Sequence, residues 1–358
     1  LFTFFNGNCS SNGKRGMIKS VAIAIFILLF YVSCSENREN KKSEEKQAII
    51  GFSQLGSESS WRVCNSESII KAAKDAGFQI IFDDAQQKQE NQIKAIRSFI
   101  VYRVDVIVFA PIVETGWDTV LEEAREAEIP VIVLDRKIKI KDLSLIKGYI
   151  GEDAREEGRK AAYFLLDKYK DFAENSETTE TAEHKENVLN ILEVSGTLHS
   201  SSAKERAAGF REVIAKEKKF QIIYSESGDF LRSRGKEIIS QIIAYNAGEL
   251  KIGAKKIDII LSHNDAMTLG ILDALDSYNI AAGKDVAIVS FDGEQKAIDA
   301  LVRGKVNCIV ECNPKTGDEL LQLIAKVIRG EEIEKETYVA EDIFTENDNF
   351  SLFEKRGY

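Results

Sequence analysis

From residue 47 onward the chain alternates between short apolar runs and longer amphipathic stretches. Each apolar run has the length and the unbroken hydrophobicity of a parallel strand that is buried on both faces. Nine such strands are expected, at 48–52, 78–82, 106–110, 131–134, 188–192, 221–224, 257–261, 286–291 and 306–310. Helices are expected between them, among others at 62–76, 88–102, 117–127, 201–216, 232–246, 265–278, 294–303 and 315–329, with Asp265 as the N-cap of its helix. Alternating units of this kind form parallel sheets that helices cover on both faces.

Nine strands would make an unusually large single sheet, and the alternation breaks once, near residues 148–153. The 358 residues of the chain are enough for two domains that each have a full core. The predicted fold class is therefore α/β, with two Rossmann-like lobes that are each built on a parallel sheet.

Net charge and cysteine spacing exclude several kinds of partner and bound group. The formal net charge of −10 argues against nonspecific binding to nucleic acid, which requires a basic surface. Cys308 and Cys312 are four residues apart on an expected strand, about 13 Å at the usual rise, which is too far for a disulfide. We expect free thiols and, because no spacing typical of zinc ligands occurs, no metal or cofactor. The acidic stretch at 170–187 is expected to be a solvated loop.

The first 46 residues have a different pattern. Met17 is followed by an apolar run without charges at 21–32, and Lys14, Arg15 and Lys19 form a basic flank. A helix needs about 20 residues to span the roughly 30 Å hydrocarbon core of a membrane, so this run suits the apolar region of a secretory signal instead. Residues 1–16 are expected to be upstream sequence that does not belong to the native protein.

The end of this signal resembles that of a bacterial lipoprotein. A small residue precedes Cys34, and a polar tract at 35–46 follows it. The resemblance implies a signal peptide at 17–33, a lipid on Cys34 and a flexible tether at 34–46. Tyr31 departs from the lipoprotein pattern, in which leucine is commonest, and an ordinary cleaved signal is the alternative.

Two polar segments follow apolar runs. They are Ser57-Glu58-Ser59-Ser60-Trp61-Arg62 and Asp135-Arg136. Open α/β sheets bind ligands at the carboxyl ends of their strands. An indole can stack on the C–H face of a sugar ring, and guanidinium and carboxylate groups can each grip two adjacent hydroxyls. The segments therefore predict a carbohydrate site, with a core role for Trp61 and a surface ion pair of Asp135 and Arg136 as the alternatives.

Further segments occur in the order found in a known family. They are Gly51-Phe52-Ser53-Gln54, Gln86-Gln87-Lys88-Gln89-Glu90-Asn91-Gln92-Ile93-Lys94-Ala95, Thr115-Gly116-Trp117, Ser227-Gly228-Asp229-Phe230, His263-Asn264-Asp265, Phe291-Asp292-Gly293 and Gly357-Tyr358. Together with the polar segments they resemble the type I periplasmic binding proteins of ABC importers, in the ribose-binding-like group, from about residue 48 to 358. Within this group the likeness is strongest to the galactofuranose-binding branch.

The resemblance implies how the chain divides. The N-terminal lobe would hold 47–151 and 313–337, and the C-terminal lobe would hold 152–312 and 338–358. The chain would then cross between the lobes three times, which makes a hinge that can close on a ligand.

The resemblance also implies ligand contacts from both lobes. They are Glu58, Ser59, Ser60, Trp61, Arg62, Asp135 and Arg136 in the first lobe, and Arg206, Asn264, Asp292 and, as an apolar wall, Phe230 in the second. The alternatives are that Arg206 lies on a solvated helix face and that Asn264 and Asp292 cap the helices after them. Ser195, Leu198 and Cys312 depart from the family pattern, which leaves the exact sugar open.

The implied site carries three arginines and three acidic residues. A closed cleft tolerates such charges only when they are paired and hydrogen-bonded. The balance favours a neutral ligand, because an anion would require surplus positive charge. We therefore expect a neutral monosaccharide, with galactofuranose first and ribose, galactose or arabinose as alternatives.

The function implied by the resemblance is that of a monomeric, extracytoplasmic solute-binding protein. It would close on its sugar and deliver it to the membrane permease of an ABC importer, with a sugar sensor that docks on a chemoreceptor or kinase as the alternative. An enzyme is not expected, because no nucleophile–base pair, metal set or Gly-x-Gly-x-x-Gly motif occurs. A DNA-binding repressor would need a helix-turn-helix where this chain has an apolar signal.

Overall fold

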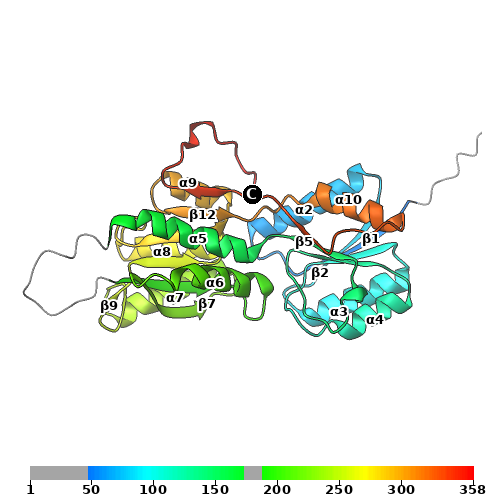
Figure 1. Ribbon diagram of the computed structural model, residues 1–358, viewed down its shortest axis with the longest axis horizontal. Coiled ribbons are helices and arrows are strands. Elements are labelled where there is room, and N and C mark those ends of the chain that lie inside the picture. Colours follow the sequence, from blue (N-terminus) through cyan, green and yellow to red (C-terminus); the bar gives the residue numbers. More distant parts are fainter. Residues whose placement is uncertain (1–46, 173–187) are drawn as a thin grey trace, which may run out of the picture. The chain divides into compact units, whose positions relative to one another are not determined.

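Two six-stranded sheets form the framework of the computed structural model, which describes residues 47–172 and 188–358 (Figure 1). The expected signal, tether and lipid site and most of the acidic loop lie outside the described residues. The sheets confirm the prediction of two α/β lobes. Within the described residues, no helix is both long and apolar enough to cross a membrane.

The first sheet is parallel throughout. Its strand order is β2 (Gln79–Asp84), β1 (Ile49–Gln54), β3 (Val106–Phe109), β4 (Val131–Leu134), β5 (Gly148–Gly151) and β13 (Glu336–Tyr338). Its helices are α2 (Ser60–Asp75), α3 (Gln89–Tyr102), α4 (Asp118–Glu126) and α10 (Gly317–Ile328). Side chains of β3 alternate between the two faces, so that Val106 and Val108 pack with α2 and α10 while Ile107 and Phe109 pack with α3 and α4. Figure 1 shows α2 and α10 side by side although they are far apart in sequence.

The second sheet repeats this design with one antiparallel edge strand. Its order is β7 (Phe220–Ser227), β6 (Leu189–Ser195), β10 (Ile259–Ser262), β11 (Ala287–Asp292), β12 (Cys308–Glu311) and β14 (Ile343–Thr345), the last of which runs antiparallel to β12. The helices are α5 (Ala154–Lys168), α6 (Ser201–Ile214), α7 (Arg232–Tyr245), α8 (Asp265–Ser277) and α9 (Gln295–Val302). Helices α5 and α6 cover one face, and α7, α8 and α9 cover the other.

Short elements complete the structure. They are the hairpin β8 (Lys251–Ile252) and β9 (Lys255–Lys256) and the 3₁₀ turns Leu143–Leu145, Lys170–Phe172 and Phe350–Leu352. The free thiols are confirmed, with Cys308 and Cys312 buried and Cys64 half-buried.

The chain passes between the sheets three times, after β5, after β12 and after β13. The exact bounds of the lobes stay a prediction. The first sheet extends one residue past 337, the expected end of the N-terminal lobe, because Tyr338 pairs with Gly151.

All nine expected strands are present, and most are shifted by one to three residues. The sequence reading missed β5, because its four residues Gly-Tyr-Ile-Gly are short and half glycine. It also missed the edge strands β13 and β14, which have only three residues each. The predicted N-cap was wrong by one position: Asn264 caps α8, and its side chain accepts a hydrogen bond from the backbone N–H of Met267.

Helices α5 and α6 approach each other backbone to backbone at two glycines. A Cβ added at Gly158 would lie 2.2 Å from the carbonyl oxygen of Arg206, and one at Gly209 would lie 1.9 Å from that of Arg155. Any side chain at either position would force the two helices apart. This contact therefore fixes the depth at which Arg206 sits in the second lobe.

We predict that Gly158→Ala lowers the free energy of unfolding by about 1–3 kcal/mol, the usual cost of overpacking a close contact. The effect opposes helix propensity, which on its own would favour alanine. Thermal or urea unfolding measures it, with Ser233→Ala on the exposed surface of α7 as the control. An unchanged or higher stability of Gly158→Ala would contradict the close packing of α5 on α6.

Candidate functional site

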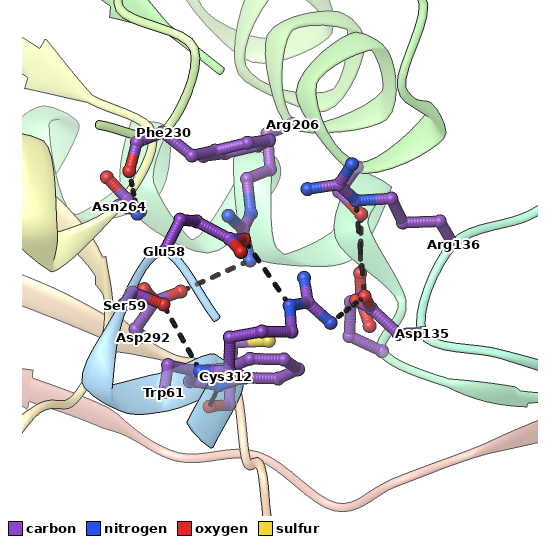
Figure 2. Close-up of a pocket in the computed structure, with 13 residues that line it drawn as sticks. Glu58, Ser59, Trp61, Asp135, Arg136, Arg206, Phe230, Asn264, Asp292 and Cys312 are labelled. Carbon is purple, nitrogen blue, oxygen red and sulfur yellow. Dashed lines mark hydrogen bonds and ion pairs between the residues drawn. The ribbon is translucent and has the colours of Figure 1, made fainter. Parts of the chain in front are cut away.

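A buried polar pocket lies where strand ends of both lobes meet (Figure 2). The space among its side chains is about 330 Å³, including the part that is open to solvent. It is lined by Glu58, Ser59, Trp61, Arg62, Asp135, Arg136, Glu152, Ser202, Arg206, Phe230, Asn264, Asp292 and Cys312. The structure thus brings together every residue of the predicted site except Ser60.

The start of α2 explains which of its residues face the pocket. Ser59 is the N-cap, and its hydroxyl oxygen accepts a hydrogen bond of 3.2 Å from the backbone N–H of Arg62. Trp61 and Arg62 are buried in the pocket wall, whereas the side chain of Ser60, at the first helical position, is exposed to solvent. Ser60 therefore does not line this pocket.

Arg62 is held by three acceptors of its own lobe. Its guanidinium forms an ion pair with Asp135, and it donates to Glu58 over 3.4 Å and to the side-chain oxygen of Gln54 over 3.3 Å. Burial alone would lower the pKa of Arg62, but the charges of Asp135 and Glu58 outweigh it and raise that pKa. Arg62 is therefore a fixed, charged donor.

Asp135 has a backbone conformation that few residues adopt, with a φ of 63°. The hydroxyl of Tyr149 donates to its carbonyl oxygen over 2.6 Å and holds it in this state. A Cβ at Gly151 would lie 2.3 Å from that hydroxyl oxygen, so only glycine fits there. Strand β5 thus fixes the turn after β4 through the hydrogen bond from Tyr149 to Asp135.

Arg136 is buried between the lobes. Its guanidinium donates to the carbonyl oxygen of Ile112 over 3.2 Å and lies 5.0 Å from the ring centre of Phe230 in the other lobe. Burial and the nearby charge of Arg62 lower the pKa of Arg136. The surface ion pair considered for Asp135 and Arg136 is therefore wrong, since both side chains are buried.

Arg206 is the central cation of the second lobe. It donates to both carboxylate oxygens of Glu157, over 2.6 and 3.3 Å, and to the carbonyl oxygen of His263 over 2.6 Å. The guanidinium of Arg206 also lies 3.8 Å from a carboxylate oxygen of Asp292. Burial raises the pKa of Asp292, and the positive charge of Arg206 only partly offsets that rise. Only 3% of Arg206 is exposed, so the alternative of a solvated helix face is wrong.

Phe230 and Asn264 form a linked part of the second lobe. The Asn264 side chain caps α8 and also donates to the carbonyl oxygen of Phe230 over 3.3 Å, so that capping and lining the pocket are compatible roles. A Cβ at Gly196 would lie 2.0 Å from the Phe230 ring. Glycine at 196 therefore makes room for that ring.

Trp61 and Phe230 lie on opposite sides of the pocket, with charged groups between them (Figure 2). The indole N–H of Trp61 donates to the carbonyl oxygen of Cys312 over 2.6 Å, which fixes the ring plane. The guanidinium of Arg62 lies 4.6 Å from the ring centre of Trp61. The core role considered for Trp61 is compatible with this position, because the ring is buried and lines the pocket at once.

Sequence reasoning missed Glu152, Ser202 and Cys312. The hydroxyl of Ser202 donates to Glu152 over 2.7 Å, and burial, followed by the charges of Asp135 and Glu157, raises the pKa of Glu152 to about 8. Glu152 directly follows β5 and Cys312 directly follows β12, so both obey the strand-end rule that found Asp135. The missed strand β5 hid Glu152, and Ser202 had no comparable signal.

The pocket offers donors and acceptors to an uncharged polar ligand. The arginines Arg62 and Arg206 already have carboxylate partners, so they provide little unpaired positive charge for an anion. Two buried atoms, Oε2 of Glu58 and Nε of Arg136, have no hydrogen-bond partner among the described residues. Such atoms need partners when buried, and ligand hydroxyls can supply them.

One cluster of possible metal ligands lies beside the pocket. Ligand atoms of Glu157, Cys312 and Glu341 lie within 4.8 Å of one another. Both oxygens of Glu157 accept from Arg206, however, and that guanidinium would repel a cation. The geometry therefore favours the buried ion pair over a metal.

The lobes also contact each other around the pocket. The backbone N–H of Glu114 donates to the carbonyl oxygen of His199 over 3.1 Å, and that of Lys137 donates to the hydroxyl of Ser201 over 2.7 Å. Lys204 forms an ion pair with Glu114 across the same boundary. The structure is thus a closed conformation.

Comparisons with known proteins agree with this fold. The galactofuranose-binding protein YtfQ of Escherichia coli is 37% identical over 278 residues, which cover 77% of this chain and 81% of YtfQ. A Mycobacterium smegmatis protein solved in complex with β-D-fucofuranose is 38% identical with a TM-score of 0.76, covering 84% of this chain and 91% of that one. The binding protein of the arabinose ABC transporter of Shewanella sp. ANA-3, bound to α- and β-L-arabinofuranose, is 39% identical with a TM-score of 0.75, covering 84% and 92%.

The family model for the periplasmic binding protein domain matches residues 50–332, which is most of the chain. The resemblance deduced from the sequence motifs is thereby confirmed. With its two lobes, its closed cleft and this match, the chain belongs to the periplasmic binding protein domain family.

Proposed function

We propose that this protein is a non-enzymatic receptor that binds a neutral monosaccharide, with galactofuranose as the leading ligand, and delivers it to the permease of an ABC importer. The observation that carries the proposal is the buried network of paired guanidinium and carboxylate groups between Trp61 and Phe230. Relatives that bind galactofuranose, fucofuranose and arabinofuranose support a five-membered sugar ring.

The pocket chemistry suggests how each group acts. The indole of Trp61 and the ring of Phe230 would pack against C–H faces of the sugar, while charged groups between them bind its hydroxyls. Asp135 and Arg136 would grip from the first lobe and Arg206, Asn264 and Asp292 from the second. Because these contacts come from both lobes, they are complete only in the closed state, which ties binding to closure.

Ribose, galactose and arabinose are the alternative ligands. The segment Glu311-Cys312-Asn313-Pro314 differs from the pattern of ribose binders, and Cys312 offers the pocket a thiol, which argues against ribose. A sensory partner in place of a permease is the alternative for delivery. We assign no catalytic step, because the relatives that support the proposal are named for sugar binding and transport.

We also propose that the protein is an extracytoplasmic monomer and that a lipid on Cys34 anchors it to the membrane. The lipoprotein-like signal before Cys34 supports the anchor, and the polar tract after it would serve as a tether. Stable anchoring needs more than one acyl chain, and a bacterial lipoprotein carries several.

The first prediction concerns the ligand. In calorimetry with neutral furanoses and pyranoses, we expect the tightest binding for galactofuranose. The dissociation constant should be on the order of micromolar, which corresponds to a binding free energy of about −8 kcal/mol. Such an affinity allows both capture and release. Heat from an amino acid or an anion but from none of the sugars would refute the proposed function.

The second prediction concerns Asp292. We expect Asp292→Asn to weaken sugar binding about 10- to 100-fold, because a carboxylate acceptor for hydroxyls is worth about 1.5–3 kcal/mol. Asparagine tolerates positive φ, so the melting temperature without sugar should change little. Titration calorimetry of this variant and of the control Asp276→Asn, on the exposed surface of α8, measures the difference. Equal affinity in both variants would place Asp292 outside the sugar contacts.

The third prediction concerns the anchor. The intact mass of the protein purified from membranes of its native host should match a chain that begins at Cys34 and carries diacylglycerol and a further acyl chain. Cys34→Ala should release the protein from the membrane fraction. A mature chain that starts elsewhere, without lipid mass, would show an ordinary cleaved signal.

A further inference from the structure

One buried carboxylate outside the pocket lining forms a hydrogen bond from the second lobe to the first. Glu294 follows β11 in the second lobe and is 4% exposed. Its Oε1 accepts a hydrogen bond of 3.2 Å from the backbone N–H of Trp61, in the first turn of α2 in the first lobe. A carboxylate of one lobe thus contacts the backbone of the residue whose ring lines the pocket from the other.

The partner of Glu294 is the N-terminus of a helix of 16 residues. The first backbone N–H groups of a helix have no partner within it, and the helix dipole makes this end positive. The Ser59 side chain satisfies the N–H of Arg62, and Glu294 satisfies that of Trp61. The second lobe therefore supplies one of the capping acceptors of α2.

Glu294 is held rigidly in its own lobe. Oδ2 of Asp265 accepts from the backbone N–H groups of Gly293 and Glu294, each over 2.7 Å, and Oδ1 accepts from the hydroxyl of Ser290 over 2.5 Å. Asp292, which lines the pocket, is two residues before Glu294. Asp265 therefore positions the pocket residue and the cross-cleft contact as one unit.

We propose that Glu294 is a positioning residue that locks the first turn of α2 to the second lobe when the cleft closes, and that it slows sugar release without touching the sugar. This inference rests on the proposed function. In the open state the N–H of Trp61 and the carboxylate of Glu294 would both face water. Closure exchanges those water contacts for a charged hydrogen bond at a helix N-terminus, which favours the closed state.

The test compares Glu294→Gln and Glu294→Ala with the parent protein, using the sugar that binds tightest in the panel. Glutamine keeps an acceptor oxygen but loses the charge, so we expect graded effects. The sugar should dissociate about 3-fold faster from Glu294→Gln and about 10-fold faster from Glu294→Ala, with association nearly unchanged. Stopped-flow fluorescence of Trp61 measures both rates in a Trp117→Phe background, because these are the two tryptophans of the chain.

Asp299→Asn is the matched control, since it removes an acidic charge from the exposed surface of the adjacent helix α9. The control should release sugar like the parent, and the Glu294 variants should melt at the parent temperature when sugar is absent. A lowered sugar-free melting temperature with unchanged release would mean that Glu294 merely stabilises its own lobe, and it would overturn the proposal. Release from Glu294→Ala at the parent rate would overturn it as well.

Failure of the proposed function has a different signature, in which the parent protein binds no sugar of the panel. That result would overturn the proposed function and, with it, a lock on sugar release. When the parent does bind sugar, amide hydrogen exchange in the first turn of α2 at saturating sugar gives a second measurement of the lock. Faster exchange in Glu294→Ala than in the parent would support the lock, and equal exchange would overturn it.

Discussion

Burying arginine side chains in a cleft requires compensating acceptors, and for Arg62 and Arg206 these acceptors are carboxylates that join elements within each lobe. Arg62 pairs with Asp135, and Arg206 pairs with Glu157, all with side chains that are almost fully buried. An unpaired charge at such a place would cost several kcal/mol. The pairs join separate elements, α2 to the end of β4 and α6 to α5. The walls of the pocket are therefore held in place by the protein itself before any ligand arrives.

Backbone strain is concentrated at the same pocket. Asp135, Phe230 and Asp292 all have positive φ angles, of 63°, 60° and 109°. Strained residues at a binding site persist when the surrounding structure determines them. The hydroxyl of Tyr149 holds the first, and the side chain of Asn264 holds the second. Asp292 is held by Asp265, whose carboxylate accepts hydrogen bonds from the backbone N–H groups of Gly293 and Glu294. A hydrogen bond from another residue therefore supports each of the three strained positions.

These supports separate two tasks that sugar receptors must combine. Under the proposed function, residues that line the pocket, such as Asp135 and Asp292, would determine which hydroxyls bind. Residues around the pocket, such as Glu114 with Lys204 and Glu294 with the end of α2, join the lobes to each other. The contacts that join the lobes and the side chains that line the pocket are therefore different groups.

The sequence by itself determined the alternation of strands and helices, and with it the two α/β lobes. It also located Asp135, which follows a recognisable strand, because the carboxyl ends of parallel strands share one edge, and the resemblance in the motifs added Asp292. Only the tertiary structure showed that Arg206 is buried, since its partner Glu157 lies on another helix, and that Ser60 faces solvent. It also revealed Glu152, hidden behind a glycine-rich strand, and the contact of Glu294 with α2. Pairing between distant segments depends on how helices and sheets pack, and local periodicity carries no information about which charged side chains that packing will bring together.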